Sequence, residues 1–245
     1  MPRIFIPHGG ITGDTATLPE AEAKRLSRVL RMGPGEHVTL FDGSREYSAV
    51  ITSINSKSAV LKITASEEKH AEPPIRIAIG QGLPKGEKLE WALQKAVELG
   101  VTSFVPVILL RSVKRPDMEG IEKGLARLRR IATEAAQQSG RLVVPDVPCY
   151  MDLGMFVEAT KGFELKVVLY EGEKTRGLKE VIRDAFGVRS VSILVGPEGG
   201  LAKDEVDEAE AAGFVPVGLG PRILRTETAG LAAISVIQYE LGDIG

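Results

Sequence analysis

Two glycine-rich turns, residues 196–200 (GPEGG) and residues 218–229 (GLGPRILRTETA), decide the fold class that we predict for this chain. Each turn follows a strand-like apolar run and precedes a helix-like one. Where a strand passes through glycines into a helix, backbone N–H groups can approach a ligand that side chains would otherwise keep away. The two turns therefore predict a small-molecule pocket built largely from main chain.

The segments around the turns alternate between strand-like and helix-like patterns, which favours an α/β domain with a parallel sheet between two layers of helices. The predicted strands are residues 75–80, 104–110, 166–170, 191–195 and 214–218. Predicted helices cover residues 87–99, 119–138 and 228–241. The last helix is apolar around much of its circumference, which burial in its own domain or against a second subunit would explain equally well.

The first seventy residues have a different, β-rich pattern. Short strands at residues 4–6, 37–41, 46–54 and 59–65, with a helix at residues 19–31, predict a small barrel. Residues 66–74 are polar and end in paired prolines, which is typical of a linker. We therefore predict two domains, residues 1–70 and residues 71–245.

The composition narrows the class of protein. Of 245 residues, 43% are hydrophobic and 26% are charged, which is ordinary for a soluble globular protein. No apolar run is long enough to span a bilayer and no signal-peptide core is present, so we expect a cytoplasmic protein without a membrane partner. The single cysteine, Cys149, excludes an intramolecular disulfide and a cysteine-based zinc cage.

Histidine usage argues against two further classes of active site. All three histidines (His8, His37 and His70) lie in the first seventy residues, far from the glycine turns in the sequence. A Ser-His-Asp triad or a histidine-ligated metal could form at the turns only by reaching across from the other domain. We therefore expect no metal and no hydrolase triad.

The charges are unevenly distributed although the formal net charge is only −2. Residues 111–130 contain seven lysines and arginines against three acidic residues, whereas residues 203–210 are strongly acidic. The basic stretch is either a footprint for nucleic-acid phosphates or an ordinary solvated helix face.

The spacing of the turns excludes two common nucleotide sites. Residues 196–200 lack the Gly-Lys-Ser/Thr ending of a P-loop, and neither turn has the G-x-G-x-x-G spacing of a dinucleotide fold. A ligand with an adenine and a cationic centre but no phosphate fits better, and S-adenosylmethionine answers that description. A purely structural role for the turns remains open at this point.

Seven ordered segments together are far more specific: residues 28–31 with 34–35, then 81–88, 94–101, 111–114, 134–141, 196–200 and 222–229. Over nearly its full length the chain resembles the RsmE family, the bacterial 16S rRNA (uracil(1498)-N(3))-methyltransferases of the SPOUT (trefoil-knot) superfamily. The resemblance implies an N-terminal PUA-like RNA-binding β-barrel, a C-terminal SPOUT-type α/β trefoil-knot domain, S-adenosylmethionine as methyl donor, a homodimer, and 16S rRNA or the small ribosomal subunit as substrate.

The resemblance also assigns the donor pocket, residue by residue. It places donor-binding residues at a strand end and in the two glycine turns, namely Tyr170, Glu171, Leu194, Gly196, Gly199, Leu219, Gly220, Ile223, Leu224, Thr228 and Ala229.

Candidate phosphate contacts with RNA are long cations in the barrel, after the first strand of the second domain, and between residues 111 and 141. They are Arg3, Arg31, Lys85, Lys88, Arg111, Lys114, Arg130 and Arg141, each of which could equally be an ordinary surface charge. The chain departs from the family at Lys24 and Arg25, where many members have paired histidines, so any base contact by those histidines is not expected here.

The chemistry of methyl transfer suggests three further residues. The N3 of uridine must lose a proton before or during the attack, and a nearby cation would stabilise the resulting anion. Arg225 is the candidate for that electrostatic role. Glu227 or Glu198 could accept the proton, although each could equally cap a turn or a helix.

Two other functions remain as alternatives. One is a non-catalytic RNA-binding protein that keeps the knotted pocket as a vestigial ligand or dimerisation site. The other is a SPOUT enzyme that methylates a ribose 2′-oxygen, for which the segments at residues 111–114 and 134–141 would not be expected.

Overall fold

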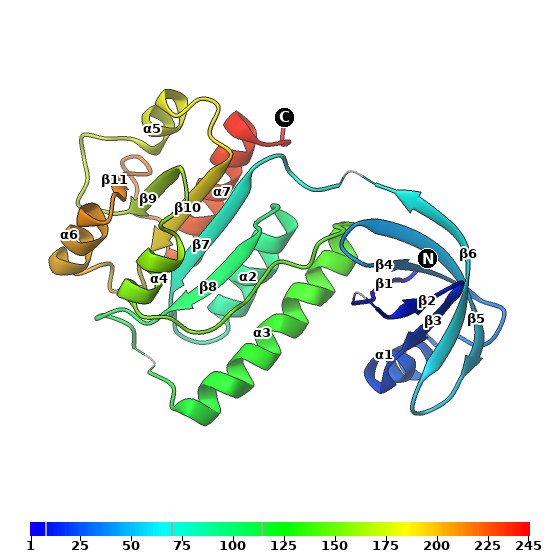
Figure 1. Ribbon diagram of the computed structural model, residues 1–245. Coiled ribbons are helices and arrows are strands. Elements are labelled where there is room, and N and C mark those ends of the chain that lie inside the picture. The colour runs from blue at the N-terminus through cyan, green and yellow to red at the C-terminus, as the bar shows by residue number, and fades with distance from the viewer. Residues whose placement is uncertain (8, 70, 114) are drawn as a thin grey trace. The chain divides into compact units, whose positions relative to one another are not determined.

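The computed structural model describes residues 1–7, 9–69, 71–113 and 115–245 and is drawn in Figure 1. The chain forms two compact units. The first contains Met1–Glu72 together with Ala136–Val144, and the second contains Pro73–Ala135 together with Pro145–Gly245. The first unit thus includes a short segment that lies more than sixty positions beyond its other residues.

The first unit is a six-stranded sheet in the order β1-β4-β5-β6-β3-β2. Neighbouring strands are antiparallel, except that β1 and β4 are parallel. Alternate residues of these strands, among them Ile4, Leu18, Leu40 and Leu61, are buried in one apolar core. The strands are β1 (Arg3–Phe5), β2 (Ile11–Thr12), β3 (Thr15–Leu18), β4 (His37–Phe41), β5 (Arg45–Ile54) and β6 (Ala59–Glu68).

Three details of this unit differ from the prediction. Strands β2 and β3 were not predicted, and β6 continues into the expected linker because its pairing with β5 extends to Glu68. The expected helix at residues 19–31 is a short α1 (Glu20–Lys24) followed by a π-helical turn η1 (Arg25–Val29). Beyond it, Arg31 has a left-handed backbone with φ of 56°.

The second unit is a five-stranded parallel sheet in the order β11-β9-β10-β7-β8. All five predicted strands are confirmed, with ends displaced by at most three residues. They are β7 (Arg76–Gly82), β8 (Ser103–Val107), β9 (Leu165–Leu169), β10 (Ser190–Val195) and β11 (Val215–Val217).

Helices cover both faces of this sheet, as the alternating pattern predicted. The three predicted helices are α2 (Lys88–Glu98), α3 (Met118–Ser139) and α7 (Thr226–Leu241). Three others were not predicted: α4 (Leu153–Ala159), α5 (Leu178–Asp184) and α6 (Lys203–Ala211). Residues 136–139, the last turn of α3, belong to the first unit.

Two glycines show which helices pack on which face. A Cβ on Gly80 of β7 would lie 2.6 Å from the ring of Phe156 in α4. A Cβ on Gly230 of α7 would lie 2.9 Å from Ile79 and 3.5 Å from Val195. Because successive residues of a strand point to opposite faces, α4 and α7 pack on opposite sides of the sheet. Helix α7 also packs against α2 and α5, and α4 against α6.

The apolar helix α7 is buried mainly within its own unit. Gly230, Ala233, Ile234 and Ile237 are all buried there, and the buried Gln238 donates to the Leu99 carbonyl through Nε2 at 2.9 Å. Of the two explanations left open by the sequence, burial in its own domain therefore accounts for most of this helix.

Over the described ranges, no helix combines the length and the apolar character required to cross a membrane. The same residues contain no group of three or more histidine, cysteine, aspartate or glutamate side chains placed to hold a metal ion.

Candidate functional site

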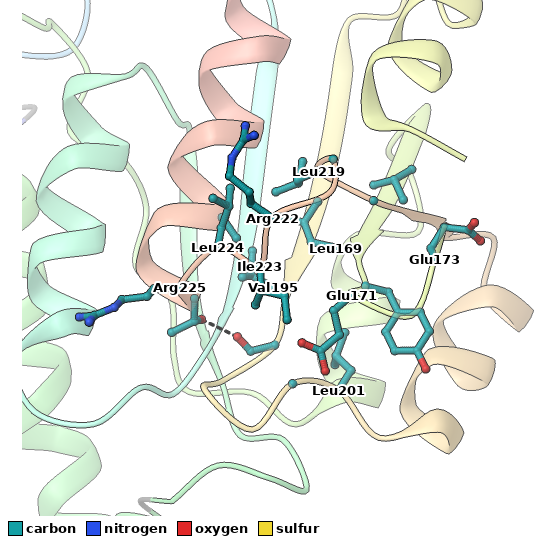
Figure 2. Close-up of a pocket in the computed structure, with 18 of the residues that line it drawn as sticks. Leu169, Glu171, Glu173, Val195, Leu201, Leu219, Arg222, Ile223, Leu224 and Arg225 are labelled. Carbon is teal, nitrogen blue, oxygen red and sulfur yellow. Dashed lines mark hydrogen bonds between the residues drawn. The ribbon is translucent and has the colours of Figure 1, made fainter. Parts of the chain in front are cut away.

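The carboxyl ends of β9, β10 and β11 surround a cavity of about 350 Å³, shown in Figure 2. Residues 170–174, 196–201 and 218–229 contribute most of its lining. Parallel sheets of α/β proteins bind ligands at this edge, and the volume lies in the ordinary range for small-molecule sites. Both glycine turns singled out in the sequence therefore meet at a single cavity.

Apolar side chains from all three strand ends face one another in this cavity (Figure 2). Among the described residues, the backbone N–H groups of Leu219 and Leu224 have no hydrogen-bond partner. Unpaired main-chain donors beside an apolar wall can bind the edge and the face of a heterocyclic ring. The apolar lining residues are Leu169, Val195, Leu201, Val217, Leu219, Ile223, Leu224 and Ala229.

Glycines allow the main chain to pack closely around the cavity. A Cβ on Gly82, at the end of β7, would lie 2.6 Å from the Pro197 nitrogen. A Cβ on Gly218 would lie 2.8 Å from the Glu173 carbonyl oxygen. Both separations are too short for any side chain, so these positions require glycine because backbone approaches backbone there.

Two carboxylates at the rim provide negative charge. The hydroxyl and N–H of Thr175 and the N–H of Arg176 donate to Glu173, and these hydrogen bonds lower the pKa of Glu173 to about 2. Glu171 lines the same cavity. The site therefore combines ring-binding surface with acceptors for a cationic group, which suits S-adenosylmethionine with its adenine and sulfonium.

Eight of the eleven predicted donor-binding residues line the cavity. Leu194 does not, because its side chain belongs to the core cluster with Phe156 on the opposite face of the sheet, and the next residue, Val195, lines the cavity instead. The eight are Tyr170, Glu171, Gly196, Leu219, Gly220, Ile223, Leu224 and Ala229.

The other two predicted residues that do not line the cavity are Gly199 and Thr228. Gly199 packs against Arg111, whose Cβ would lie 3.1 Å from an added Cβ, and Gly200 lines the cavity. Thr228 is exposed on α7, whereas Thr226 is buried and lines the cavity. Each of the three predicted residues is one or two positions from a residue that lines the cavity.

The three proposed catalytic residues lie at one side of the cavity, but their placements differ. Arg225 and Glu198 are lining residues, whereas Glu227 is not. Figure 2 shows the Arg225 side chain pointing away from the apolar cluster, and it has no ion pair with any described residue. Its guanidinium is exposed at the rim, available to a molecule outside the cavity.

Glu198 accepts hydrogen bonds from the first residue of α2 and from the segment that precedes it. Its Oε1 accepts from the Lys85 N–H at 2.9 Å and from Lys88 Nζ at 3.2 Å. Burial alone would raise the pKa of Glu198, but these hydrogen bonds and one from its own N–H lower the pKa below its ordinary value. Glu198 is therefore a weak proton acceptor.

Two of the candidate RNA contacts are engaged inside the first unit. Arg3 donates to Glu46 Oε2 at 2.7 Å and stacks on the Phe41 ring at 4.6 Å. Arg141 is only 4% exposed and donates to Glu72 Oε2 at 2.6 Å. Neither guanidinium is placed to meet a phosphate, so we leave both out of the proposed RNA surface.

The other candidates differ in how far their charges are already paired. Arg111 donates to the Gly199 carbonyl at 2.8 Å, and Arg130 pairs with Glu134 at 2.9 Å on an exposed helix face. Arg31 and Lys85 are exposed and have no side-chain ion pair with a described residue. Lys114 lies outside the described residues.

The two positions that depart from the family pattern are also paired locally. Lys24 forms an ion pair with Glu20 one helical turn away. Arg25 donates to Gln137 Oε1 and lies 3.5 Å from Glu22. Their charges are therefore partly neutralised within the first unit.

Sequence reasoning missed several lining residues. Leu169, Val195 and Val217 are the last residues of their strands, so the ends of three neighbouring parallel strands could have indicated them. Glu173 and Lys174 follow β9 in a loop without any local motif. Lys88 also lines the cavity, although the sequence predicted it only as an RNA contact. The remaining ones are Pro197, Gly200, Leu201, Gly218, Pro221, Arg222 and Thr226, which flank the predicted glycines.

Comparison with known proteins connects this geometry to a family. Residues 71–238 match the model of an RNA methyltransferase domain, and residues 18–64 match that of an RNA methyltransferase PUA domain. The chain is 35% identical over 232 residues to ribosomal RNA small subunit methyltransferase E of Bacillus subtilis, covering 92% of this chain and 90% of the relative.

Solved structures agree over the whole chain. Ribosomal RNA small subunit methyltransferase E from Neisseria gonorrhoeae, bound to S-adenosyl methionine, is 36% identical, with a TM-score of 0.88 and 99% of both chains covered. A putative methyltransferase from Legionella pneumophila in complex with the same cofactor is 32% identical, with a TM-score of 0.90, covering 99% of this chain and 98% of the other.

These matches confirm the expected fold class, a PUA-like barrel unit followed by a SPOUT-type α/β domain, and S-adenosylmethionine as the cofactor class. The match in both units, with nearly complete coverage of each relative, excludes a likeness that is confined to the fold of one domain. The chain therefore belongs to the ribosomal RNA small subunit methyltransferase E family of RNA methyltransferases.

Proposed function

We propose that this chain transfers a methyl group from S-adenosylmethionine to N3 of a uridine in the rRNA of the small ribosomal subunit. The observation that carries the proposal is the cavity at the ends of β9, β10 and β11, with unpaired main-chain donors at Leu219 and Leu224, in a chain of this family. The relatives from Bacillus subtilis and Neisseria gonorrhoeae are named for methylation of small-subunit rRNA.

The chain's own residues would hold the donor in three ways. The N–H groups of Leu219 and Leu224 would donate to its adenine, and Leu169 and Val195 would cover the ring. Glu171 would offset the positive charge of the sulfonium. The bound donor supplies an activated methyl group, so the protein's main task is to align the two reactants.

Arg225 would act on the other reactant, the uridine. Its exposed guanidinium lies at the rim of the cavity, where an incoming base would meet it. The N3 nitrogen becomes nucleophilic as its proton leaves, and a fixed cation beside the base stabilises the negative charge left on N3 and the flanking oxygens. Because Glu198 is a weak acceptor and Glu227 does not line the cavity, the proton would pass to solvent at this rim.

The proposed RNA contacts outside the cavity are the cations whose charges remain accessible. In the second unit these are Lys85, Arg111 and Arg130, and in the first unit Arg31. Each would meet a phosphate and contribute affinity that falls with salt. The target uridine itself must be unstacked to reach the donor.

We also propose that the chain acts as a homodimer. Five residues on one side of α7 remain partly or largely exposed after α7 has packed in its own unit, and Tyr239 is 68% exposed. Their spacing places them on a single helix face. The face consists of Leu231, Ala232, Ser235, Val236 and Tyr239. Light scattering should give a dimeric mass, and Val236→Arg should lower it to that of a monomer; a monomeric wild type would contradict this proposal.

The decisive experiment is mass mapping of N3-methyluridine in 16S rRNA from cells with and without this protein, followed by transfer assays on naked 16S rRNA and on assembled small subunits. The proposal predicts that one N3-methyluridine disappears on deletion and returns with the wild-type gene. A methyl group on a ribose 2′-oxygen would favour the second alternative of the sequence analysis. Donor binding by calorimetry without transfer to either substrate would favour the non-catalytic one.

A further inference from the structure

Helix α2 begins with a lysine, although a cation is unfavourable at the positive end of a helix dipole. The ammonium of Lys88 lies 3.2 Å from Glu198 Oε1 and 3.5 Å from Glu227 Oε1. Glu198 belongs to the first glycine turn, and Glu227 to the first turn of α7. The Lys88 side chain thus connects the start of α2 to the first glycine turn and to the start of α7. The glycine turn lies more than one hundred residues after Lys88 in the sequence, and α6 and β11 separate it from α7.

Lys88 is the ion-pair partner of Glu227 among the described residues. The Glu227 side chain is 12% exposed, and its Oε2 is buried without a hydrogen-bond partner among the described residues. Removing a cation from two neighbouring carboxylates leaves like charges side by side, one of them poorly solvated. The start of α7 and the glycine turn would then repel each other at the wall of the cavity, which both line through Thr226 and Glu198.

Lys85 provides the contrast. It lies three positions earlier and also touches Glu198, but through its backbone N–H at 2.9 Å. Its own side chain is exposed and makes no hydrogen bond or ion pair with a described residue. The sequence made Lys85 and Lys88 equal candidates for phosphate contacts. In the structure, their ammonium groups have different surroundings.

We propose that Lys88 is a positioning residue of the donor site: its ammonium clamps Glu198 and Glu227 and so holds the first glycine turn against the start of α7. Its charge serves the two carboxylates, and Lys85 is the phosphate contact of this segment. The inference rests on the proposed function only in treating the cavity as the donor site.

The test compares Lys88→Met with the matched variant Lys85→Met, which removes the same charge from the same segment. Calorimetry with S-adenosylmethionine in the absence of RNA should show donor affinity weakened about fivefold or more for Lys88→Met and unchanged for Lys85→Met. The slope of RNA affinity against salt concentration should decrease by about one for Lys85→Met and remain unchanged for Lys88→Met.

A double variant separates the clamp from a general loss of charge. Lys88→Met combined with Glu227→Gln removes the repulsion together with the lysine, so donor affinity should recover relative to Lys88→Met alone. Lys88→Arg, which can still bridge the two carboxylates, should bind the donor nearly as well as the wild type. Wild-type donor affinity in Lys88→Met together with a reduced salt slope, or no recovery in the double variant, would overturn the proposal.

Thermal unfolding of the same variants tests the clamp independently of the proposed function, because it requires no methyl transfer. Lys88→Met should lower the unfolding temperature in the wild-type background and have a smaller effect in the Glu227→Gln background, whether or not any rRNA is methylated. Equal effects in both backgrounds would also contradict the clamp. Failure of methyl transfer with an intact clamp would contradict only the proposed function.

Discussion

Gln81 of β7 and Thr226 of α7 are hydrogen-bonded across 145 positions of sequence: Gln81 Nε2 donates to Thr226 Oγ1 at 2.8 Å. The same hydroxyl donates to the Gly196 carbonyl. Both side chains are buried, and Gly196 and Thr226 line the cavity. One threonine hydroxyl therefore connects β7, the first glycine turn and the start of the last helix beneath the donor site.

Thr226→Val should reduce both stability and donor affinity. The change keeps the side-chain shape but removes the hydroxyl partner of the Gly196 carbonyl and one of the two acceptors of Gln81 Nε2, which still donates to the Gly82 carbonyl at 3.1 Å. An unpaired buried polar group costs about 1–3 kcal/mol. Chemical denaturation and calorimetry would measure the two effects. Thr226→Ser retains the hydroxyl and serves as control, so equal behaviour of the two variants would show that the hydroxyl is not the fastening element.

Arg225→Ala should lose methyl transfer and keep donor binding. The guanidinium lies at the rim and points away from the apolar lining, so it would act on the target base and not on the donor. Loss of one fixed group that stabilises a developing anion lowers the rate about 10²- to 10³-fold. Single-turnover transfer to small-subunit RNA would measure this, with Arg222→Ala from the same turn as control. Unchanged turnover would remove Arg225 from the mechanism.

Arg31→Gly should stabilise the protein while weakening RNA binding. Arg31 has φ of 56°, where a side chain is strained and glycine is not, so the change should add up to about 1 kcal/mol to the free energy of unfolding. Loss of the exposed charge should reduce the salt slope of RNA affinity by about one. Arg31→Lys, which retains a charge, provides the control. An unchanged slope in the glycine variant would mean that Arg31 does not contact phosphate.

Asp42 should make the first unit sensitive to acid. Burial alone would raise the pKa of Asp42, but hydrogen bonds from the Ser44 N–H, the Tyr47 hydroxyl, the Arg45 N–H and the Ser44 hydroxyl lower it to about 2. A carboxyl whose pKa is lower in the folded state stabilises the fold above its unfolded pKa, near 4, and this contribution disappears as the pH falls through 2.

Denaturant unfolding between pH 6 and pH 2 would measure this loss. Asp42→Asn should be less stable than the wild type at pH 6, and the difference should shrink as the pH falls below about 4. A difference that stays constant over that range would contradict the assignment to Asp42.

The sequence by itself determined the fold class and the position of the site along the chain. In the second unit, the apolar residues recur with a helical period in the long helices and form short apolar runs in the strands. Because these patterns are visible within short stretches of sequence, the three longest helices and all five strands of this unit were predicted. The glycine turns at residues 196–200 and 218–229 were recognisable because glycines between a strand-like and a helix-like run are visible in the sequence itself. The contact that requires glycine at Gly218 is with the Glu173 carbonyl oxygen of another segment. Short helices such as α5 carry too few turns for a period to emerge.

Only the tertiary structure decided which side chains reach the site. Leu194 and Val195 are equally apolar, and strand pairing alone determines which face each takes. Lys85 and Lys88 are equally basic, but just one ammonium meets Glu198 and Glu227. Arg3 also donates to the Arg141 carbonyl, 138 positions away, because residues 136–144 belong to the first unit. A charge or an apolar group acquires its role from partners that are distant in sequence, and no local pattern contains that information.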